Sequence, residues 1–318
     1  MSNASTQAPF ITVIVPTYNR PQLLPVALAS IKSQSYTSFE CVVVNDYPEG
    51  QEAVDKTVEA LDDTRFRVVH NPHSLGASGT RNKGIREAAG SIVAFLDDDD
   101  QWMSAYLAKH SAVYEQDDTV GVVCSGMRVE WQENALPPRQ FIPKVAPEPP
   151  AIQSAMLNDE FDIFTTSALS FRKACVEEVG GFDESLPSFE EWELCYRIGE
   201  HYRIASITEP LTVFYQHLNY RMTGNIEQRK EGLEALLNKY NHEEGFVRFC
   251  RKYIAQIHFV NIKNNVLIGK ATWNRQLFKK FLSHNTVSLS SRYEMKLAIK
   301  MMILVILGKP GFKIINLF

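Results

Sequence analysis

Residues 95–102 read FLDDDDQW. Four consecutive aspartates, Asp97 to Asp100, follow an uncharged apolar run at residues 92–96. Such a run predicts a strand that is buried on both faces, as in a parallel sheet covered by helices. The carboxylates must then lie at the exit of the strand, because four of them in a core would be strongly desolvated. Open α/β sheets bind ligands at the carboxyl ends of their strands, so the stretch predicts a ligand site there.

Two interpretations of the aspartates fit this stretch taken alone. If the chain stays extended, Asp97 and Asp99 point to one side, and two hard oxygen ligands suit Mg²⁺ or Mn²⁺ with a substrate phosphate completing the coordination. In the other interpretation the aspartates form a solvated turn, and Asp100 is an acidic cap for a helix that starts near Ser104. The surrounding sequence favours the first interpretation.

Strands and helices alternate over roughly the first 100 residues. This alternation predicts right-handed βαβ units and a parallel sheet. The small, polar stretch at residues 76–84 (GASGTRNKG) is expected to precede a helix that runs through Ile85 and Ala89. Its glycines match neither GxGxxG nor a Walker A motif, which argues against a dinucleotide fold or a P-loop. The strands are expected at residues 10–16, 39–44, 65–70 and 92–96, and the first two helices at 23–31 and 54–61.

The pattern continues to about residue 224 and then changes. Six prolines within residues 133–152 predict a loop over a cleft. From residue 225 the chain reads as helical, and the apolar run at residues 301–307 is too short to span a membrane. It is expected to pack on the protein, or to lie on a membrane surface beside nearby lysines. Further strands are expected at 119–124, 127–131, 167–171, 202–207 and 211–215, and helices at 107–114, 174–179, 189–198, 225–242, 245–268 and 272–283.

The composition excludes several classes of protein. With 45% hydrophobic and 22% charged residues, the 318-residue chain has ordinary globular composition, and its net charge of −4 argues against nucleic-acid binding. The five cysteines form no CxxC pair, which predicts neither a zinc site nor a disulfide framework and favours a reducing, cytoplasmic location. No signal peptide is evident. Residues 1–9 are expected to be a disordered terminus or a tag remnant.

Six motifs in order carry a resemblance to a known family. The chain resembles the family-two inverting glycosyltransferases, which have the α/β fold called GT-A, with a Rossmann-like, mostly parallel central sheet flanked by helices. The resemblance covers residues 10–224 and implies a nucleotide-binding half (10–125) and an acceptor half (126–224). It does not reach the helical C-terminal extension, 225–318. The motifs are VIVPTYNRP (13–21), VVVNDYP (42–48), GASGTRNKGI (76–85), FLDDDDQW (95–102), GGFDESLPSFEEWEL (180–194) and FYQHLNYRMTG (214–224).

The resemblance implies transfer of a sugar from a nucleotide-diphosphate donor, most often a UDP-sugar, to a hydroxyl of a glycan or glycolipid acceptor. It also implies a divalent cation, Mn²⁺ or Mg²⁺. The implied donor residues are Pro16 and Thr17 in the base-binding loop, Asp46 as acceptor of a hydrogen bond from the base, Arg81 beside it, and Asp97 and Asp98 on the nucleotide side. The others are Asp99 for the metal, His217 for the metal or diphosphate, Glu191 as general base, and Glu190 and Trp192 on the acceptor side.

One position departs from the pattern of the family. The general base is usually Asp, and here it is Glu191, whose side chain is longer by one methylene. Glu190 or Glu193 could serve in its place, or all three could be capping acids of a helix. The competing functions are a nucleotidyltransferase of similar fold and an inactive module that binds nucleotide sugars. His217 could equally be a solvated residue of a polar loop.

Overall fold

The computed structural model describes residues 10–131, 137–216, 226–267 and 299–304. The chain divides into two compact units, residues 1–221 and 222–318. The first unit contains the described sheet and the helices that cover it, and it holds nearly all of the sequence motifs.

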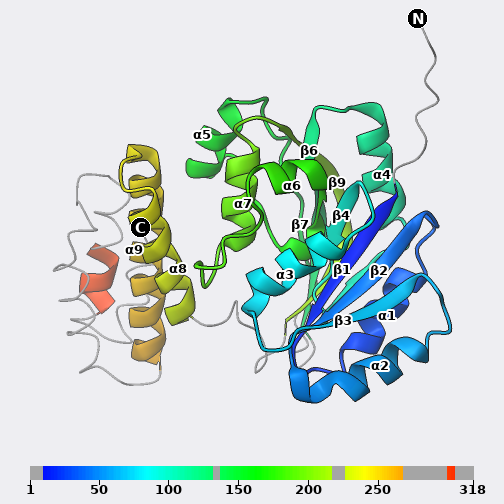
Figure 1. The fold of residues 1–318 in the computed structure, drawn as a ribbon. Helices are drawn as coiled ribbons and strands as arrows, with labels where there is room; N and C mark the ends of the chain where they lie inside the picture. The colour runs from blue at the N-terminus through cyan, green and yellow to red at the C-terminus, as the bar shows by residue number, and fades with distance from the viewer. Residues whose placement is uncertain (1–9, 132–136, 217–225, 268–298, 305–318) are drawn as a thin grey trace, which may run out of the picture. The chain divides into compact units, whose positions relative to one another are not determined.

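The first part of this unit has the predicted alternation of strands and helices, and its strands run parallel to one another. Four strands pair in the order β3-β2-β1-β4, and all three pairs are parallel. Helices α1 and α2 lie on one side of this sheet and α3 on the other (Figure 1), as right-handed crossovers require when the strand order reverses. The elements are β1 (Ile11–Thr17), α1 (Leu24–Lys32), β2 (Phe39–Asn45), α2 (Gln51–Glu59), β3 (Phe66–His70), α3 (Gly76–Glu87) and β4 (Ile92–Phe95).

The register of these strands brings their carboxyl ends to one edge of the sheet. Thr17 is paired with Asn45, and Ile14 is paired with Phe95. The strands are rich in valine and isoleucine because both faces are covered, and most of their side chains are fully buried. The polar segments that follow β1, β2 and β4 therefore emerge together at this edge.

The structure corrects the prediction for the third helix. Helix α3 begins at Gly76 and ends at Glu87, so the whole stretch GASGTRNKG is helical. Its glycines permit close packing on the sheet: a Cβ on Gly84 would lie 2.4 Å from Cγ2 of Ile14 in β1. The sequence reading treated small polar residues as a loop signal, whereas here they let a helix approach a strand.

The second part of the sheet is mixed. The full order is β3-β2-β1-β4-β8-β6-β9-β5, with β7 paired to β6, and β8 is antiparallel to both of its neighbours. These pairings confirm the α/β class with a central sheet flanked by helices. The elements are β5 (Asp100–Trp102), α4 (Tyr106–Gln116), β6 (Val120–Trp131), β7 (Arg139–Phe141), α5 (Ala151–Leu157), β8 (Leu169–Arg172), α6 (Lys173–Glu178), α7 (Glu190–Ile198) and β9 (Arg203–Gln216).

Two pairs of predicted strands are in fact two long strands. Residues 119–124 and 127–131 belong to β6, and residues 202–207 and 211–215 belong to β9. These strands pair in parallel along their length, with shifts in register around Gly126, opposite Pro210. Gly126 and Pro210 therefore mark an irregularity within a continuous strand pair.

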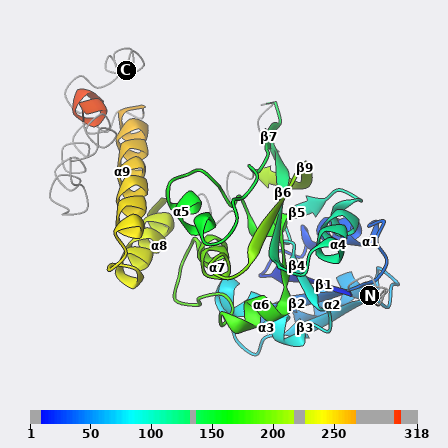
Figure 2. The ribbon, with the colours of Figure 1, turned by 90° about the horizontal axis from the view of Figure 1, so that it is seen from above.

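Helices α6 and α7 lie next to α3 in both views (Figures 1 and 2). Helix α6 is followed by Gly180 and Gly181, both with positive φ. At Gly181 a Cβ would lie 2.6 Å from Oδ1 of Asn82, which accepts a hydrogen bond from the Phe182 amide at 2.9 Å. The GGFD motif thereby connects α3 to the segment leading into α7.

The second unit contains the predicted helices α8 (Ile226–Lys239) and α9 (Glu244–Leu267). They pack against each other through buried Leu233, Leu236 and Phe246, and the rings of Tyr240 and Phe246 stack with centroids 4.0 Å apart. The predicted helix at 272–283 and residues 305–307 of the apolar run lie outside the described residues, while residues 301–304 of that run are helical, with Met301 and Leu304 buried. Among the residues that are described, no helix is both long and apolar enough to cross a membrane.

Candidate active site

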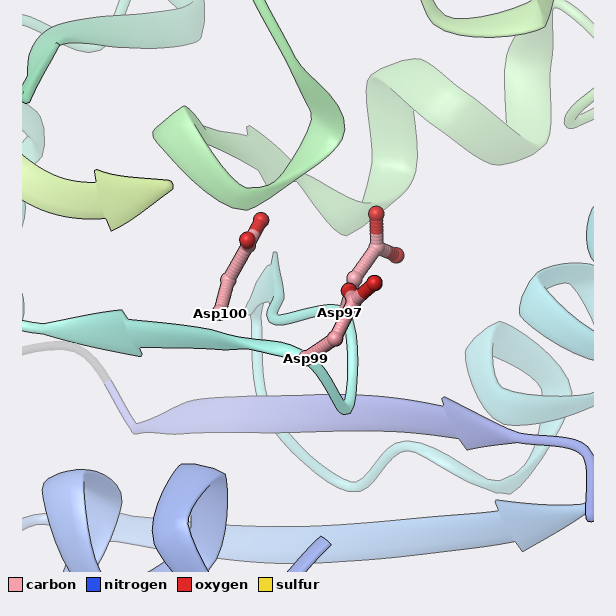
Figure 3. A group of neighbouring side chains, drawn as sticks. All are labelled: Asp97, Asp99 and Asp100. Atoms are coloured by element: carbon pink, nitrogen blue, oxygen red, sulfur yellow. The ribbon is translucent and has the colours of Figure 1, made fainter. Parts of the chain in front are cut away.

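The acidic stretch after β4 forms a turn. The Asp100 amide donates to the Asp97 carbonyl at 3.0 Å, so the chain does not stay extended there. The side chains of Asp97, Asp99 and Asp100 nevertheless project to the same side, and each offers an oxygen within 4.8 Å of the others (Figure 3). Ser167 holds the turn: its hydroxyl accepts from the Asp97 amide at 3.1 Å and donates to Oδ2 of Asp100 at 2.7 Å.

The alternative interpretation of these aspartates as a helix cap is wrong. Helix α4 begins at Tyr106, and its N-cap residue, Ala105, makes no side-chain capping bond. Asp100 belongs instead to β5, where it pairs with Phe214, and it is only 1% exposed. Its burial against Ser167 places it in the acidic cluster, a role that the sequence analysis did not assign to it.

Asp98 points into the protein rather than into the cluster. It is fully buried, accepts a hydrogen bond from Oγ1 of Thr17 at 2.6 Å and pairs with Arg20 at 2.7 Å. Burial raises the pKa of Asp98 to about 7, although Arg20 and Thr17 both favour its charged form. Asp98 and Thr17, both predicted to bind the nucleotide, therefore bond to each other on the side of the turn that faces the protein interior. Pro16, beside Thr17 in β1, is partly exposed.

Arg20 connects the loop after β1 to the acidic turn. Besides Asp98, its guanidinium donates to Oδ2 of Asp99 at 3.0 Å. In the sequence analysis Arg20 appears only within the motif at residues 13–21 and has no assigned role. No signal in the sequence could have paired it with residues almost eighty positions away.

Asp46 organises the loop that leads into α3. Its buried carboxylate accepts four hydrogen bonds from the chain itself, which matches the roughly four lone-pair sites of a carboxylate. A nucleotide base could bond to Asp46 only in exchange for one of these donors. They are Nδ2 of Asn71 at 2.8 Å, Oγ of Ser74 at 2.7 Å, and the amides of Leu75 at 2.7 Å and Gly76 at 3.0 Å.

Two tyrosines lie beside Asp46 at the same edge of the sheet. Tyr18 is 51% exposed, and its ring meets that of Tyr47 edge-on with centroids 5.4 Å apart. Asn45 fixes the backbone of Tyr47, since its amide group donates to the Tyr47 carbonyl at 2.9 Å and accepts from the Tyr47 amide at 3.1 Å. The sequence analysis missed both aromatics, although Tyr18 directly follows the end of β1 and Tyr47 lies two residues after the end of β2.

Arg81 joins the acidic turn to helix α7. Its buried guanidinium donates to Oδ1 of Asp97 at 2.9 Å and to Oε1 of Glu190 at 3.0 Å. Burial lowers the pKa of Arg81, but the charges of Asp97 and Glu190 outweigh this effect and raise it above its usual value. A single buried side chain of α3 thus fixes the first turn of α7 relative to the acidic cluster.

The three glutamates at the start of α7 have different surroundings. Glu190 is bound to Arg81, while fully buried Glu193 pairs with Arg197 at 2.7 Å. Among the described residues, no basic side chain lies within ion-pair distance of Glu191. Burial raises the pKa of the Glu191 carboxyl well above its usual range, and the neighbouring charge of Glu190 adds to this shift. Of the three, Glu191 is the carboxylate suited to accept a proton.

Two of the predicted residues remain, Trp192 and His217. Trp192 is 6% exposed, and its ring stacks with that of Tyr196 with centroids 5.7 Å apart. His217 lies outside the described residues. The structure therefore brings Asp97, Asp99 and Arg81 together with the start of α7, and it leaves His217 unplaced.

Comparisons with known proteins identify the family of the chain. The model of the family described as Glycosyl transferase family 2 matches residues 12–180, just over half of the 318 residues. The putative colanic acid biosynthesis glycosyl transferase WcaA of Escherichia coli K12 is 28% identical over 262 residues, which cover 77% of this chain and 85% of that protein.

A second curated protein and a solved structure are also similar to this chain. The Escherichia coli protein named UDP-Glc:alpha-D-GlcNAc-diphosphoundecaprenol beta-1,3-glucosyltransferase WfgD is 30% identical over 94 residues, 30% of this chain and 36% of that protein. The solved structure of the mannosyltransferase PcManGT from Pyrobaculum calidifontis, in complex with GDP-Man and Mn²⁺, has the same fold. It has a TM-score of 0.58 and 21% identity, over 98% of this chain and 84% of that one. From the extent of the family match, the chain belongs to glycosyl transferase family 2 and is a transferase enzyme.

Proposed function

We propose that this glycosyltransferase moves a sugar from a nucleotide-diphosphate donor to a hydroxyl of a glycan or glycolipid acceptor, with inversion at the anomeric carbon, in polysaccharide biosynthesis. The observation that carries the proposal is the position of Glu191. It has no basic partner among the described residues, its pKa is raised, and it adjoins Glu190, which Arg81 ties to the acidic turn. Inversion follows from a single displacement with one base, which removes the proton of the acceptor hydroxyl.

A divalent cation fits the acidic cluster. Three carboxylate oxygens within 4.8 Å of one another form a hard donor set, which suits Mg²⁺ or Mn²⁺. Asp97, Asp99 and Asp100 would hold the ion, and Asp100 is an addition to the predicted set. When bound, the ion supplies positive charge to the leaving diphosphate. The Mn²⁺ in the structure of the mannosyltransferase supports this assignment.

The donor nucleotide is assigned to residues 10–125, at the edge where β1 and β2 end. Exposed Tyr18 and neighbouring Tyr47 offer an aromatic face for the base, and Pro16 and Asp46 lie at the same edge. We assign UDP as the nucleotide, because the name of the similar diphosphoundecaprenol glucosyltransferase specifies UDP-Glc. Thr17 and Asp98 contribute indirectly through the hydrogen bond that supports the turn.

The acceptor is assigned to residues 126–224, on the side of α7. The raised pKa of Glu191 makes its carboxylate a better proton acceptor than an ordinary glutamate. The ion pair of Glu190 with Arg81 orients the first turn of the helix, and Trp192 is proposed to line the acceptor side. A diphosphoundecaprenol-linked glycan, the acceptor in the name of that relative, is the proposed acceptor class.

The location of the enzyme is a separate proposal. All five cysteines lie within the described ranges and are buried free thiols, which supports a reducing, cytoplasmic compartment. Contact of residues 296–318 with the cytoplasmic face of a membrane is a further proposal. Flotation of the full chain with anionic liposomes tests it, and flotation that does not change after deletion of these residues would reject it.

The test of the function is a panel of donors. UDP, GDP and dTDP are each added with and without Mn²⁺, and the unfolding midpoint is measured, because ligands of the native state raise it by mass action. We expect a shift that depends on Mn²⁺ for UDP. The matching UDP-sugar is then incubated with a diphosphate-linked lipid acceptor, and NMR reads the anomeric configuration of the product. Binding without turnover would favour the inactive module, and a retained configuration would refute inversion.

A further inference from the structure

We propose that Arg20 is an internal counter-ion of the cation site, which weakens binding of a divalent cation to the donor-free enzyme and so couples cation binding to the nucleotide diphosphate. The inference rests on the proposed function, since it assumes that Asp97, Asp99 and Asp100 hold the cation. It assigns a role to a residue that lies outside the predicted site.

The position of Arg20 is fixed at two points. Its carbonyl accepts hydrogen bonds from the amides of Leu23 and Leu24 at 3.1 and 3.4 Å, at the start of α1. Its guanidinium bridges Oδ1 of Asp98 at 2.7 Å and Oδ2 of Asp99 at 3.0 Å. Because Asp98 is fully buried and is also bound by Thr17, its ion pair with Arg20 anchors the guanidinium at one end.

Asp99 belongs to two sets of contacts. It contributes an oxygen to the acidic cluster and accepts a hydrogen bond from Arg20. A cation that binds Asp99 must share this carboxylate with a guanidinium, and the two positive charges repel each other across a short distance. The side chain of Arg20 is 26% exposed, so water screens this repulsion only in part. Without a donor, Arg20 therefore opposes the cation.

A nucleotide diphosphate changes this balance. It brings negative charge to the cluster, and a guanidinium can donate several N–H groups to phosphate oxygens while it keeps its bond to Asp98. The repulsion between Arg20 and the cation is then offset by their shared attraction to the diphosphate. By linkage, the diphosphate must tighten cation binding by the same factor by which the cation tightens diphosphate binding.

Arg81 provides a contrast within the same site. It also bonds to a residue of the cluster, Asp97, but its side chain is 6% exposed and it is held at its other end by Glu190. Arg81 has no room to exchange partners without breaking a buried pair. Arg20, which is more exposed and reaches Asp99 from the solvent-accessible loop after β1, is the arginine that can redistribute its bonds when ligands enter.

The experiment is calorimetric titration of the full-length protein with Mn²⁺ in the absence of nucleotide. We expect Arg20→Gln to bind Mn²⁺ at least about fivefold more tightly than wild type, the lower end of couplings between sites in one protein. Arg20→Lys, which keeps the charge, should stay close to wild type. Repeating the titration with saturating UDP should show that UDP tightens Mn²⁺ binding by a smaller factor in Arg20→Gln than in wild type.

A matched control is Arg65→Gln, which removes a surface arginine paired with Asp63 at 2.6 Å and should leave the affinity for Mn²⁺ unchanged. If Arg20→Gln does not fold, Arg20→Gln with Asp98→Asn is compared with Asp98→Asn alone, because the amide needs no counter-ion. Unchanged or weaker Mn²⁺ binding without Arg20 would overturn this inference only. No Mn²⁺ binding by any folded variant, with or without UDP, would instead refute the proposed cation site.

Discussion

Replacement of Arg81 by methionine tests the link between the acidic turn and helix α7. Methionine keeps the unbranched apolar stem of the side chain but removes the guanidinium, so Asp97 and Glu190 both lose a partner at about 3 Å. These carboxylates are only 24% and 12% exposed. Removing one partner of a buried pair costs about 3–5 kcal/mol, and the partial exposure of Asp97 points to the lower end.

This free energy predicts a measurable loss of thermal stability. For a domain of 150–250 residues, about 3 kcal/mol corresponds to a fall in Tm of about 6–12 °C. The assay is thermal unfolding followed by circular dichroism, with Arg65→Met as the control. Arg65 is 29% exposed, and its loss leaves one carboxylate, Asp63, without this partner rather than two, so it should cost clearly less than the loss of Arg81.

A double-mutant cycle separates the ion pair from the volume of the side chain. In a protein that already carries Glu190→Gln, Arg81→Met should lower the free energy of unfolding by less than it does alone. The reason is that one of the two carboxylates that lose their partner has already been replaced by a neutral amide. A fall in Tm no larger than that of Arg65→Met would refute the bridging role of Arg81. Strict additivity with Glu190→Gln would show that the pair itself contributes nothing.

Three further predictions concern the base, the packing of α3 and the nucleotide. Because burial raises the pKa of folded Glu191 to about 8 and a general base acts when deprotonated, kcat/KM should rise with pH around pH 8 and not near 4.5; a profile that is flat from pH 5 to 9 would contradict this. Gly84→Ala should lower the free energy of unfolding, measured with denaturant, by about 1–3 kcal/mol, since its Cβ would lie 2.4 Å from Cγ2 of Ile14. An unchanged unfolding midpoint would show that β1 can shift to make room for the methyl group. Tyr18→Ala should weaken UDP binding by about 1–3 kcal/mol, the range for a base stacked on an aromatic ring. If calorimetry finds the same affinity for UDP as in wild type, Tyr18 does not contact the base.

The sequence was informative where the signal is local. The apolar run before Asp97 predicted a buried strand, and the alternation of strands and helices predicted the parallel part of the sheet, because buried faces and short crossovers leave periodic patterns. The place of the acidic cluster, at the end of β4, followed from the same reasoning. In each case neighbouring residues determine the outcome.

The sequence was uninformative where distant residues decide. The bonds of Ser167 to the acidic turn, and of Arg20 to Asp98 and Asp99, join segments about seventy to eighty positions apart and leave no mark on either segment. The glycines of α3 carried a signal that was misinterpreted, because a helix that must approach β1 closely uses the residues that loops also use. The three glutamates of α7 look alike in sequence and are distinguished only by Arg81 and Arg197.

The most direct measurement compares Glu191→Gln with wild type in two assays on the same protein. The first is binding of UDP with Mn²⁺ by thermal shift, and the second is the rate of sugar transfer to a lipid-linked acceptor. Glu177→Gln on α6, an exposed glutamate, is the control. Glu191→Gln should bind UDP as wild type does and lose about 10²- to 10⁴-fold in transfer rate, the contribution of a general base. Transfer that stays within about threefold of wild type, well below that range, would show that Glu191 is not the base.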